Sequence, residues 1–234
     1  MKEEIEEKPV FRLILSTEAD SFIQSIPEKA REKVRYNIRR IQKGEQNREL
    51  FKKLDGTEIW EFRTLFNKIA YRLFAFWDTE AETLVIATHG IVKKTQKTPS
   101  KEIAKAEEIR KLYFELKKKK MNMEKVGDMK FIDFEDVLDR DLGKVGTPKR
   151  DEFERKVDES VHAYRLGEAI KKARLQQNLT QEQLGERIGV KRAQISKLEK
   201  GYSITIPTMS RVFKALGIAT ATLDLGSIGK VALW

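Results

Sequence analysis

The sequence predicts an α+β protein in two parts, an N-terminal antiparallel sheet with helices and a C-terminal all-α domain. Its 234 residues exceed the ~150 of one typical domain. Strand-like hydrophobic runs occur in the N-terminal half, whereas the pattern near the C-terminus predicts consecutive short helices. Residues 1–120 carry 27 Lys and Arg against 20 Asp and Glu, residues 121–166 carry 9 against 12, and residues 167–234 carry 11 against 5. Two basic modules around an acidic segment indicate two surfaces for polyanions, with uneven surface solvation as the alternative.

The composition excludes several classes of protein. The chain has no Cys and only two His, which argues against disulfides, thiolate chemistry and a zinc site. It has neither a Walker-type phosphate loop nor a dinucleotide glycine motif, so we expect no cofactor and no metal. No apolar run approaches the ~18 residues of a membrane span, and the Glu-rich start does not resemble a signal peptide. We therefore expect a cytoplasmic protein without membrane contact.

The N-terminal elements follow from caps and periodicity. Residues 10–15 predict a strand, and Ser16 or Thr17 can cap the helix that follows. Pro27 fits the first turn of a second helix, in which one apolar stripe is formed by Ala30, Val34, Ile38 and Ile41. Residues 59–63, 69–77 and 83–89 predict three strands of an antiparallel meander. Thr98-Pro99 then predicts a helix to about Leu116.

Cationic side chains gather on these strands and on the loop after them: Arg63, Arg72, His89, Lys93, Lys94 and Lys97. Cleaving RNA without a metal requires a deprotonated 2′-hydroxyl, neutralised charge on the phosphate and a protonated leaving oxygen. Arg and Lys can neutralise the phosphate, and His or a cation of lowered pKa can protonate the leaving group. The alternative is that these basic residues keep a sheet edge soluble.

Three motifs carry a family resemblance: Trp60-Glu61-Phe62-Arg63, Tyr71-Arg72-Leu73-Phe74, and the run Thr88-His89-Gly90-Ile91-Val92-Lys93-Lys94-Thr95-Gln96-Lys97-Thr98-Pro99. Over residues 10–115 the chain resembles the RelE/HigB toxin superfamily, close to its phage-derived branch. The resemblance implies a ribosome-dependent mRNA endonuclease that leaves a 2′,3′-cyclic phosphate and a 5′-hydroxyl.

The resemblance also implies roles for single residues. Arg72 matches the arginine that stabilises the phosphate, and the other cationic positions are matched by Arg63, Lys93 and Lys94, with Lys97 as an RNA contact. The C-terminal tyrosine of some members has no counterpart here. The general base is open between His89 and Glu61, and either side chain can instead cap a strand end or pair with Arg63.

In the C-terminal part, Thr180-Gln181-Glu182-Gln183 has the pattern of a capping box. Gly185 permits close approach of two helices, and Gly189 permits the positive φ of a tight turn between them. The second helix, residues 191–199, has outward side chains suited to base edges or phosphates in a major groove: Lys191, Arg192, Gln194 and Lys197. A structural three-helix bundle is the alternative.

Residues 179–201, from Leu179-Thr180-Gln181 to Glu199-Lys200-Gly201, resemble the Xre/Cro family of DNA-binding domains. The resemblance implies that Gln181 lies near a phosphate and that bases are faced by Arg192, Ala193 and Lys197. It also implies a homodimer on a palindromic operator, with half-sites about one helical turn apart.

Four segments follow from these patterns: a toxin-like domain (1–116), a linker (117–130), an acidic helical segment (131–166) and a helix-turn-helix domain with a tail (167–234). The linker begins with a run of lysines, and Met121 fits the start of a second protein, joined naturally or artificially. The acidic segment has one apolar pattern in Phe131, Phe134, Leu138 and Leu142 and a second from Phe153 to Tyr164. It packs either on the C-terminal domain or on the basic N-terminal domain, and it resembles the N-terminal part of HigA antitoxins.

These observations predict a HigB-like toxin joined to a HigA-like antitoxin. The expected partners are operator DNA, mRNA on the ribosome, and the toxin-antitoxin contact itself, within one chain or between chains. Inhibition works either by covering the cations or by adding bulk that prevents entry to the ribosome. Two alternatives are a non-enzymatic transcription regulator and a pair of domains that has lost both activities.

Overall fold

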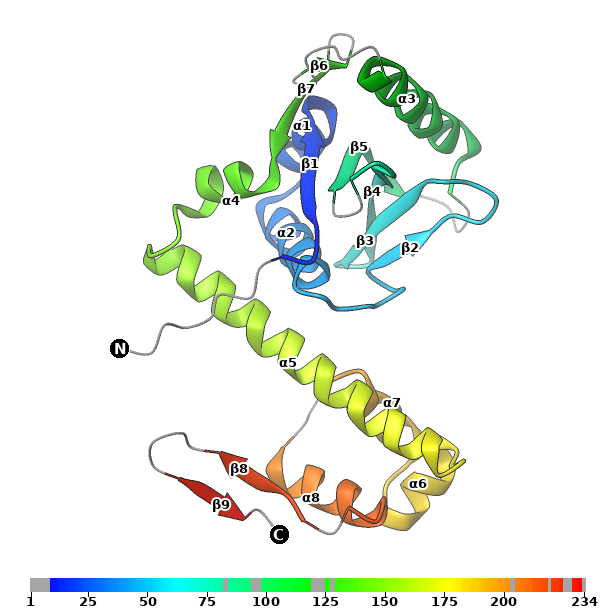
Figure 1. Ribbon diagram of the computed structural model, residues 1–234, viewed down its shortest axis with the longest axis vertical. Coiled ribbons are helices and arrows are strands. Elements are labelled where there is room, and N and C mark those ends of the chain that lie inside the picture. Colours follow the sequence, from blue (N-terminus) through cyan, green and yellow to red (C-terminus); the bar gives the residue numbers. More distant parts are fainter. Residues whose placement is uncertain are drawn as a thin grey trace. The chain divides into compact units, whose positions relative to one another are not determined.

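A computed structural model describes residues 9–81, 84–93, 98–118, 125–126, 129–202, 205–218, 220–224 and 229–232. The chain forms two compact units, residues 1–158 (unit 1) and 159–234 (unit 2). The elements of unit 1 are β1 (Arg12–Ser16), α1 (Thr17–Ser25), α2 (Glu28–Gln42), β2 (Phe51–Lys53), β3 (Trp60–Phe66), β4 (Ile69–Trp77), β5 (Leu84–Lys93), α3 (Ser100–Lys118), β6 (Lys125–Val126), β7 (Met129–Asp133) and α4 (Phe134–Leu142) (Figure 1). Helix α5 (Pro148–Gln176) begins in unit 1 and ends in unit 2. Unit 2 then has α6 (Gln181–Ile188), α7 (Arg192–Glu199), α8 (Ile206–Ala215), β8 (Thr222–Asp224) and β9 (Lys230–Ala232).

The predicted α+β class is confirmed, and so is the antiparallel meander of β3, β4 and β5. Across the described residues the sheet has the order β2-β3-β4-β5-β1-β7-β6. Strand β1 pairs in parallel with β5, so the sheet is mixed. A parallel pair requires a crossover connection, and this one contains α1 and α2 on one side of the sheet. The three-residue strand β2 was not predicted, because so short a run carries no clear period.

A β-bulge in β5 determines which side chains reach the functional face. Ala75 pairs with Ala87 but the preceding Phe74 pairs with His89, so Thr88 is an extra residue. Side chains alternate across a strand, and one extra residue reverses the alternation. The His89 side chain therefore lies on the same face as Phe74.

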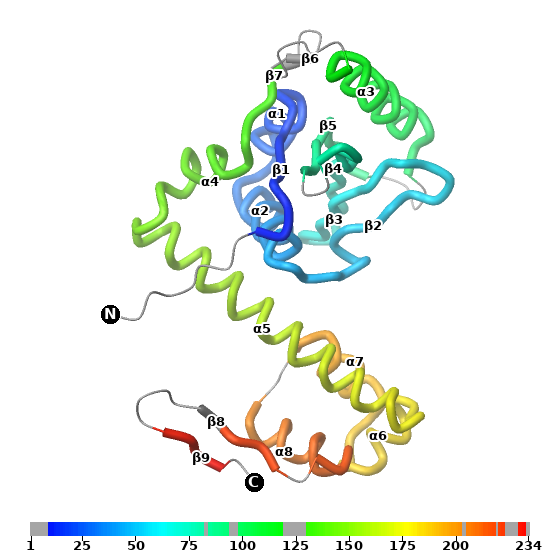
Figure 2. The backbone as a smooth tube through the Cα atoms, in the orientation of Figure 1, coloured from blue at the N-terminus to red at the C-terminus, as the bar shows by residue number. Residues whose placement is uncertain are grey.

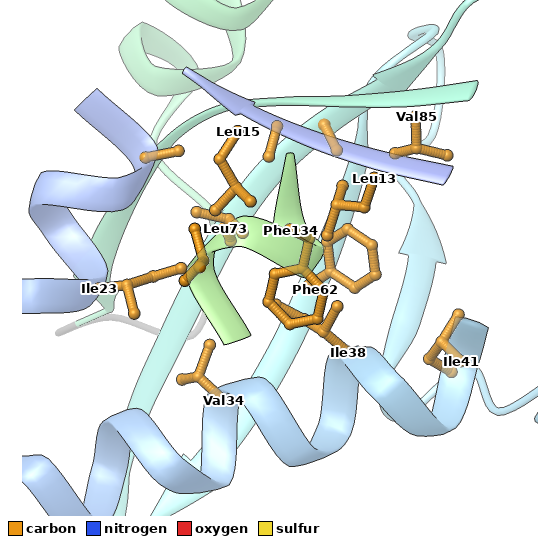
Figure 3. Close-up of a cluster of buried hydrophobic side chains, with 14 of the residues drawn as sticks. Leu13, Leu15, Ile23, Val34, Ile38, Ile41, Phe62, Leu73, Val85 and Phe134 are labelled. Atoms are coloured by element: carbon orange, nitrogen blue, oxygen red, sulfur yellow. The ribbon is translucent and has the colours of Figure 1, made fainter. Parts of the chain in front are cut away.

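Two hydrophobic clusters cover the two faces of the sheet. One lies under α1, α2 and α4 and contains the predicted stripe of α2 from Ala30 to Ile41 (Figure 3). The other lies under α3 and includes Phe74, Phe76 and Tyr113. Helix α1 is capped by Ser16, whose Oγ accepts from Ala19 N at 3.0 Å. Pro27 is the N-cap of α2 rather than a first-turn residue.

Part of the predicted linker is regular structure. Helix α3 continues to Lys118, and β7 pairs antiparallel with β1, with Ile14 opposite Asp133. Phe131 was predicted on a helix but lies in β7, because Asp133 caps α4 by accepting from Glu135 N. Phe134, Val137 and Leu138 of α4 are fully buried in the same cluster as β1 and α2. Strand β7 and helix α4 thus complete the core of unit 1.

Unit 2 contains the predicted helix-turn-helix, whose backbone path can be followed in Figure 2. The Thr180 capping box forms, and Gly189 has a φ of +71° in the turn. A Cβ at Gly185 would lie 2.6 Å from the Val190 carbonyl oxygen, so the close approach is real. The predicted domain begins at Gly167, but the first helix of this unit is the end of the long α5, which continues through Gly167 without a break. A Cβ at Gly167 would lie 2.5 Å from the Glu199 carbonyl oxygen, so this glycine permits close packing of α5 on the end of α7. The tail from Gly217 contains the β8–β9 hairpin.

Candidate functional site

The sheet brings two predicted arginines together around a buried glutamate. Arg63 and Arg72 pair directly across β3 and β4, and Glu61 lies two residues before Arg63 on the same face. Glu61 Oε1 is 3.2 Å from Arg63 Nε and 3.5 Å from Arg72 Nε. Glu61 is 3% exposed. We call these three residues, with Lys93, the sheet cluster.

The sheet cluster is a partly desolvated cationic site. Arg72 is 8% exposed and donates from Nη1 to the Tyr71 carbonyl at 2.9 Å. Burial lowers the pKa of Arg72, against the attraction of Glu61. Burial also lowers the pKa of Lys93, and the charge of Arg72 lowers it further. Because β5 places Lys93 opposite Ala70, two residues before Arg72, the ammonium lies on the face of both arginines.

His89 is separated from solvent by α3. It is 1% exposed, its ring stacks on Phe74 with centroids 4.8 Å apart, and Nδ1 lies 3.0 Å from Thr88 Oγ1. Its Nε2 lies 3.3 Å from Glu102 Oε2 of α3. Burial lowers the pKa of His89, with a second contribution from Lys105, so the ring is neutral near pH 7. These contacts connect β5 to α3.

Thr98, just before α3, makes a contact with the sheet cluster that was not predicted. Lys94 and Lys97 lie outside the described residues. Thr98 was predicted as a helix cap, but its Oγ1 donates to Glu61 Oε2 at 3.3 Å. Its position in the Thr88–Pro99 motif was the sequence signal for this contact. The loop before α3 therefore helps to hold the glutamate of the sheet cluster.

The predicted DNA-contacting residues lie on the exposed side of α7. Ile195 and Leu198 are buried in the core of unit 2, whereas the opposite side of the helix is exposed at Lys191, Arg192, Ala193, Gln194 and Lys197. Lys191 is the N-cap of α7, and its N–H donates to Gln194 Oε1 at 3.1 Å. The Gln194 side chain is thus engaged at the start of the helix. The remaining exposed side chains form a surface suited to a major groove.

Gln181 is held by a buried carboxylate. Its Nε2 donates to Glu199 Oε2 at 2.7 Å, and Arg174 Nε donates to Glu199 Oε1 at 2.5 Å. Glu199 is 4% exposed. This arrangement fixes Gln181 at the N-terminus of α6, where helix N–H groups also favour a phosphate.

The acidic segment contacts the N-terminal domain inside unit 1. In α4, Asp141 pairs with Arg35 and Glu135 pairs with Arg39. In the first turns of α5, Glu154 Oε2 lies 3.1 Å from Arg39 Nε and 3.0 Å from Lys43 Nζ. These contacts are made on the α1 and α2 side of the sheet, opposite the face that carries the sheet cluster. The sequence left two packing partners open for this segment, and its residues 134–158 contact α1 and α2.

Comparisons with protein families agree with this geometry. Residues 21–111 match the family described as phage-derived protein Gp49-like, and residues 170–223 match a helix-turn-helix family. A comparison with curated proteins finds no match. Among the described helices, none is long and apolar enough to cross a membrane. Within the described ranges no group of three His, Asp or Glu side chains is arranged to hold a metal ion.

Both resemblances predicted from the sequence are therefore confirmed at the level of domains. The first match contains Arg63, Arg72, His89 and Lys93, and the second contains all the exposed residues of α7. The chain carries a Gp49-like domain over residues 21–111, which is similar to RelE/HigB-type toxins, followed by an Xre-type helix-turn-helix DNA-binding domain over residues 170–223.

Proposed function

We propose that the N-terminal domain is a ribosome-dependent mRNA endonuclease that works without a metal, and that the helix-turn-helix domain represses its own operon. The observation that carries the nuclease proposal is the sheet cluster, in which a buried glutamate holds two arginines side by side. Preorganised cations in a desolvated site stabilise the negative charge that develops on a phosphate in the transition state. This is the demand that 2′-hydroxyl attack makes on an enzyme.

In this proposal each cation has one role. Arg72 and Arg63 neutralise the scissile phosphate, and Lys93 protonates the leaving 5′-oxygen, because its lowered pKa makes it a better acid than a free lysine. His89 acts through the position of α3, since its ring is buried between Phe74 and Glu102. Glu61, the other candidate base, takes the proton of the attacking 2′-hydroxyl. On the basis of the family resemblance, Lys94 remains a proposed catalytic cation and Lys97 a proposed RNA contact.

The second half restrains the nuclease, in this proposal, through added bulk. Residues 134–158 contact α1 and α2 and leave the face of Arg63, Arg72 and Lys93 to α3. They therefore do not inhibit by covering the cations. A covalently tethered segment is present at an effective concentration of order mM, which makes the docked form the resting state.

The test compares three chains in growing cells while mRNA 5′ ends are mapped. The full chain, a chain ending at Gly146 and that shorter chain with Arg72→Ala are induced at matched soluble levels. We end the short chain at Gly146 because β7 and α4 complete the core of unit 1. Growth arrest with new mRNA ends only in the unmutated short chain supports the proposal. Normal growth and intact mRNA in all three would instead favour a non-enzymatic regulator.

Repression is tested separately with DNA from upstream of the coding sequence. We expect the full chain to protect two half-sites about one helical turn apart as a homodimer. A footprint without two-fold symmetry would contradict the dimer.

A further inference from the structure

Helix α2 carries a second cationic surface that the proposed chemistry does not use. Arg35, Arg39 and Lys43 follow one another at intervals of four residues, so they lie on one side of the helix about 6 Å apart along its axis. We call them the cation row. They are 3%, 6% and 9% exposed.

Carboxylates of the acidic segment cover the cation row. Asp141 contacts Arg35, Glu135 contacts Arg39, and Glu154 lies between Arg39 and Lys43. Lys43 Nζ also lies 2.6 Å from Asp158 Oδ1. Arg35 and Arg39 belong to α2 and Lys43 is its C-cap, whereas the carboxylates belong to α4 and α5, where Glu135 and Glu154 also pair with the buried Arg150. The carboxylates that cover the cation row are spaced negative charges, like the phosphates of a nucleic-acid backbone.

The stability of the docked form does not account for these charges. A buried ion pair contributes little net stability compared with apolar residues of similar size, and the segment already packs on the core through the fully buried side chains of Phe134, Val137 and Leu138. Burial lowers the pKa of Arg35 even with Asp141 beside it, which shows a desolvation cost. We infer that the cations of this row have a role when residues 134–158 are undocked from α2.

We propose that the cation row is a binding surface for an RNA phosphate backbone, and that the carboxylates of α4 and α5 occupy it in place of phosphates. This inference rests on the proposed function only in taking RNA as the polyanion. Two occupants of one surface must compete, so RNA bound at the row weakens docking of the segment by the same factor by which docking weakens RNA binding.

The experiment measures binding of a fluorescein-labelled RNA hairpin by the full chain as salt is varied. All proteins carry Arg192→Ala and Lys197→Ala so that the helix-turn-helix does not contribute. The uncovering variant is Glu135→Gln, Asp141→Asn and Glu154→Gln. The matched control removes the same charge from exposed positions of the same helices, Asp136→Asn, Asp151→Asn and Glu152→Gln.

We expect the uncovering variant to bind RNA at least ~10-fold more tightly than the control at low salt. Three additional phosphate contacts should steepen the plot of log affinity against log salt by about 2 to 3. Adding Arg35→Gln, Arg39→Gln and Lys43→Gln should abolish both gains. Equal affinity of the uncovering variant and the control overturns the proposal when hydrogen exchange shows residues 134–158 exposed.

If hydrogen exchange shows those residues still docked, a second preparation gives the answer. A protease site in the exposed loop 143–146 is cut in the uncovering variant, and the pieces are separated in 1 M salt, where screening weakens ion pairs. The N-terminal piece keeps β7 and α4 without the carboxylates at positions 135 and 141, and it lacks Asp158 and the rest of α5. Unchanged RNA affinity of this piece relative to the uncut chain also overturns the proposal.

The result is separable from the proposed nuclease activity. Arg72 lies on the other face of the sheet, so Arg72→Ala in the uncovering variant should leave the gain in RNA binding intact. If RNA binds at the cation row but no variant cleaves RNA, the nuclease proposal fails and the binding surface stands.

Discussion

Two buried glutamates, one in each domain, hold functional side chains in different ways. Glu61 lies between Arg63 and Arg72, which are themselves the proposed chemical groups. Glu199 holds Gln181 and Arg174, whereas the side chains of α7 that are predicted to face bases are exposed: Arg192, Ala193 and Lys197. The two glutamates are almost equally buried, at 3% and 4% exposure.

The difference follows from what each surface must do. A phosphate undergoing reaction needs cations that are already in place, because reorganisation during the reaction would raise the barrier. A groove-reading helix needs its backbone in place but can adjust long side chains to the bases on contact. The burial of Glu61 and Arg72 thus distinguishes the proposed chemical site from the exposed side of α7.

The largest effect should come from removing a preorganised cation. Arg72→Ala in the chain ending at Gly146 should lower mRNA cleavage in a cell-free translation extract by about 100- to 1,000-fold, because one charge-stabilising donor is lost. Lys53→Ala removes an exposed lysine that pairs with Glu58 and should change little. A loss of less than threefold for Arg72→Ala would show that the sheet cluster is not the chemical site.

On the exposed surface, Arg192→Ala should weaken binding of the full chain to its operator by roughly 5- to 150-fold, the range for one good base contact. Lys172→Ala on the exposed side of α5 provides a control of the same charge change. Titration of labelled DNA measures both. If Arg192→Ala weakens binding to operator DNA and to random DNA by the same factor, Arg192 contacts phosphate instead of bases.

The glutamate of the sheet cluster can be tested by removing only its charge. Glu61→Gln should reduce cleavage by about 10- to 100-fold, because Arg63 and Arg72 lose the group that orients them and small displacements are costly in an active site. Operator binding by the full chain should not change. The matched control is Glu58→Gln, because Glu58 is exposed in the bend between β2 and β3. Full activity of Glu61→Gln would show that the charge of Glu61 is not needed to orient Arg63 and Arg72.

Sequence reasoning located most elements of the fold but few of the contacts. Periodicity and caps predicted the meander, α1, α2 and the helix-turn-helix, because these signals are local. The parallel pairing of β1 and the strand β7 depend on contacts between distant segments, which no local period reports. The bulge at Thr88 was equally hidden, and it decides which face His89 occupies.

The same limit applies to the cations. Arg35 and Arg39 lie off the apolar stripe formed by Ala30, Val34, Ile38 and Ile41, and positions off such a stripe are normally exposed to solvent. They are buried because carboxylates more than 90 residues away in the sequence cover them. Residue type and spacing identified the arginines of the sheet cluster through a family resemblance, but only the fold shows that one glutamate holds both.

The smallest predicted effect concerns the pH dependence of cleavage. If Lys93 is the general acid, it must be protonated, so the rate falls as pH rises through its pKa. Burial, Arg72, Arg63 and Lys52 lower that pKa while Glu61 raises it, so the alkaline limb lies below the ordinary lysine value of about 10.4. Lys52→Ala removes one of the like charges and should move the limb to higher pH with little change in rate at neutral pH. Lys53→Ala, whose neighbour Glu58 already pairs with it, is the control. An alkaline limb that stays in place in Lys52→Ala would exclude Lys93 as the proton donor and would leave the arginines as the groups that act on the phosphate.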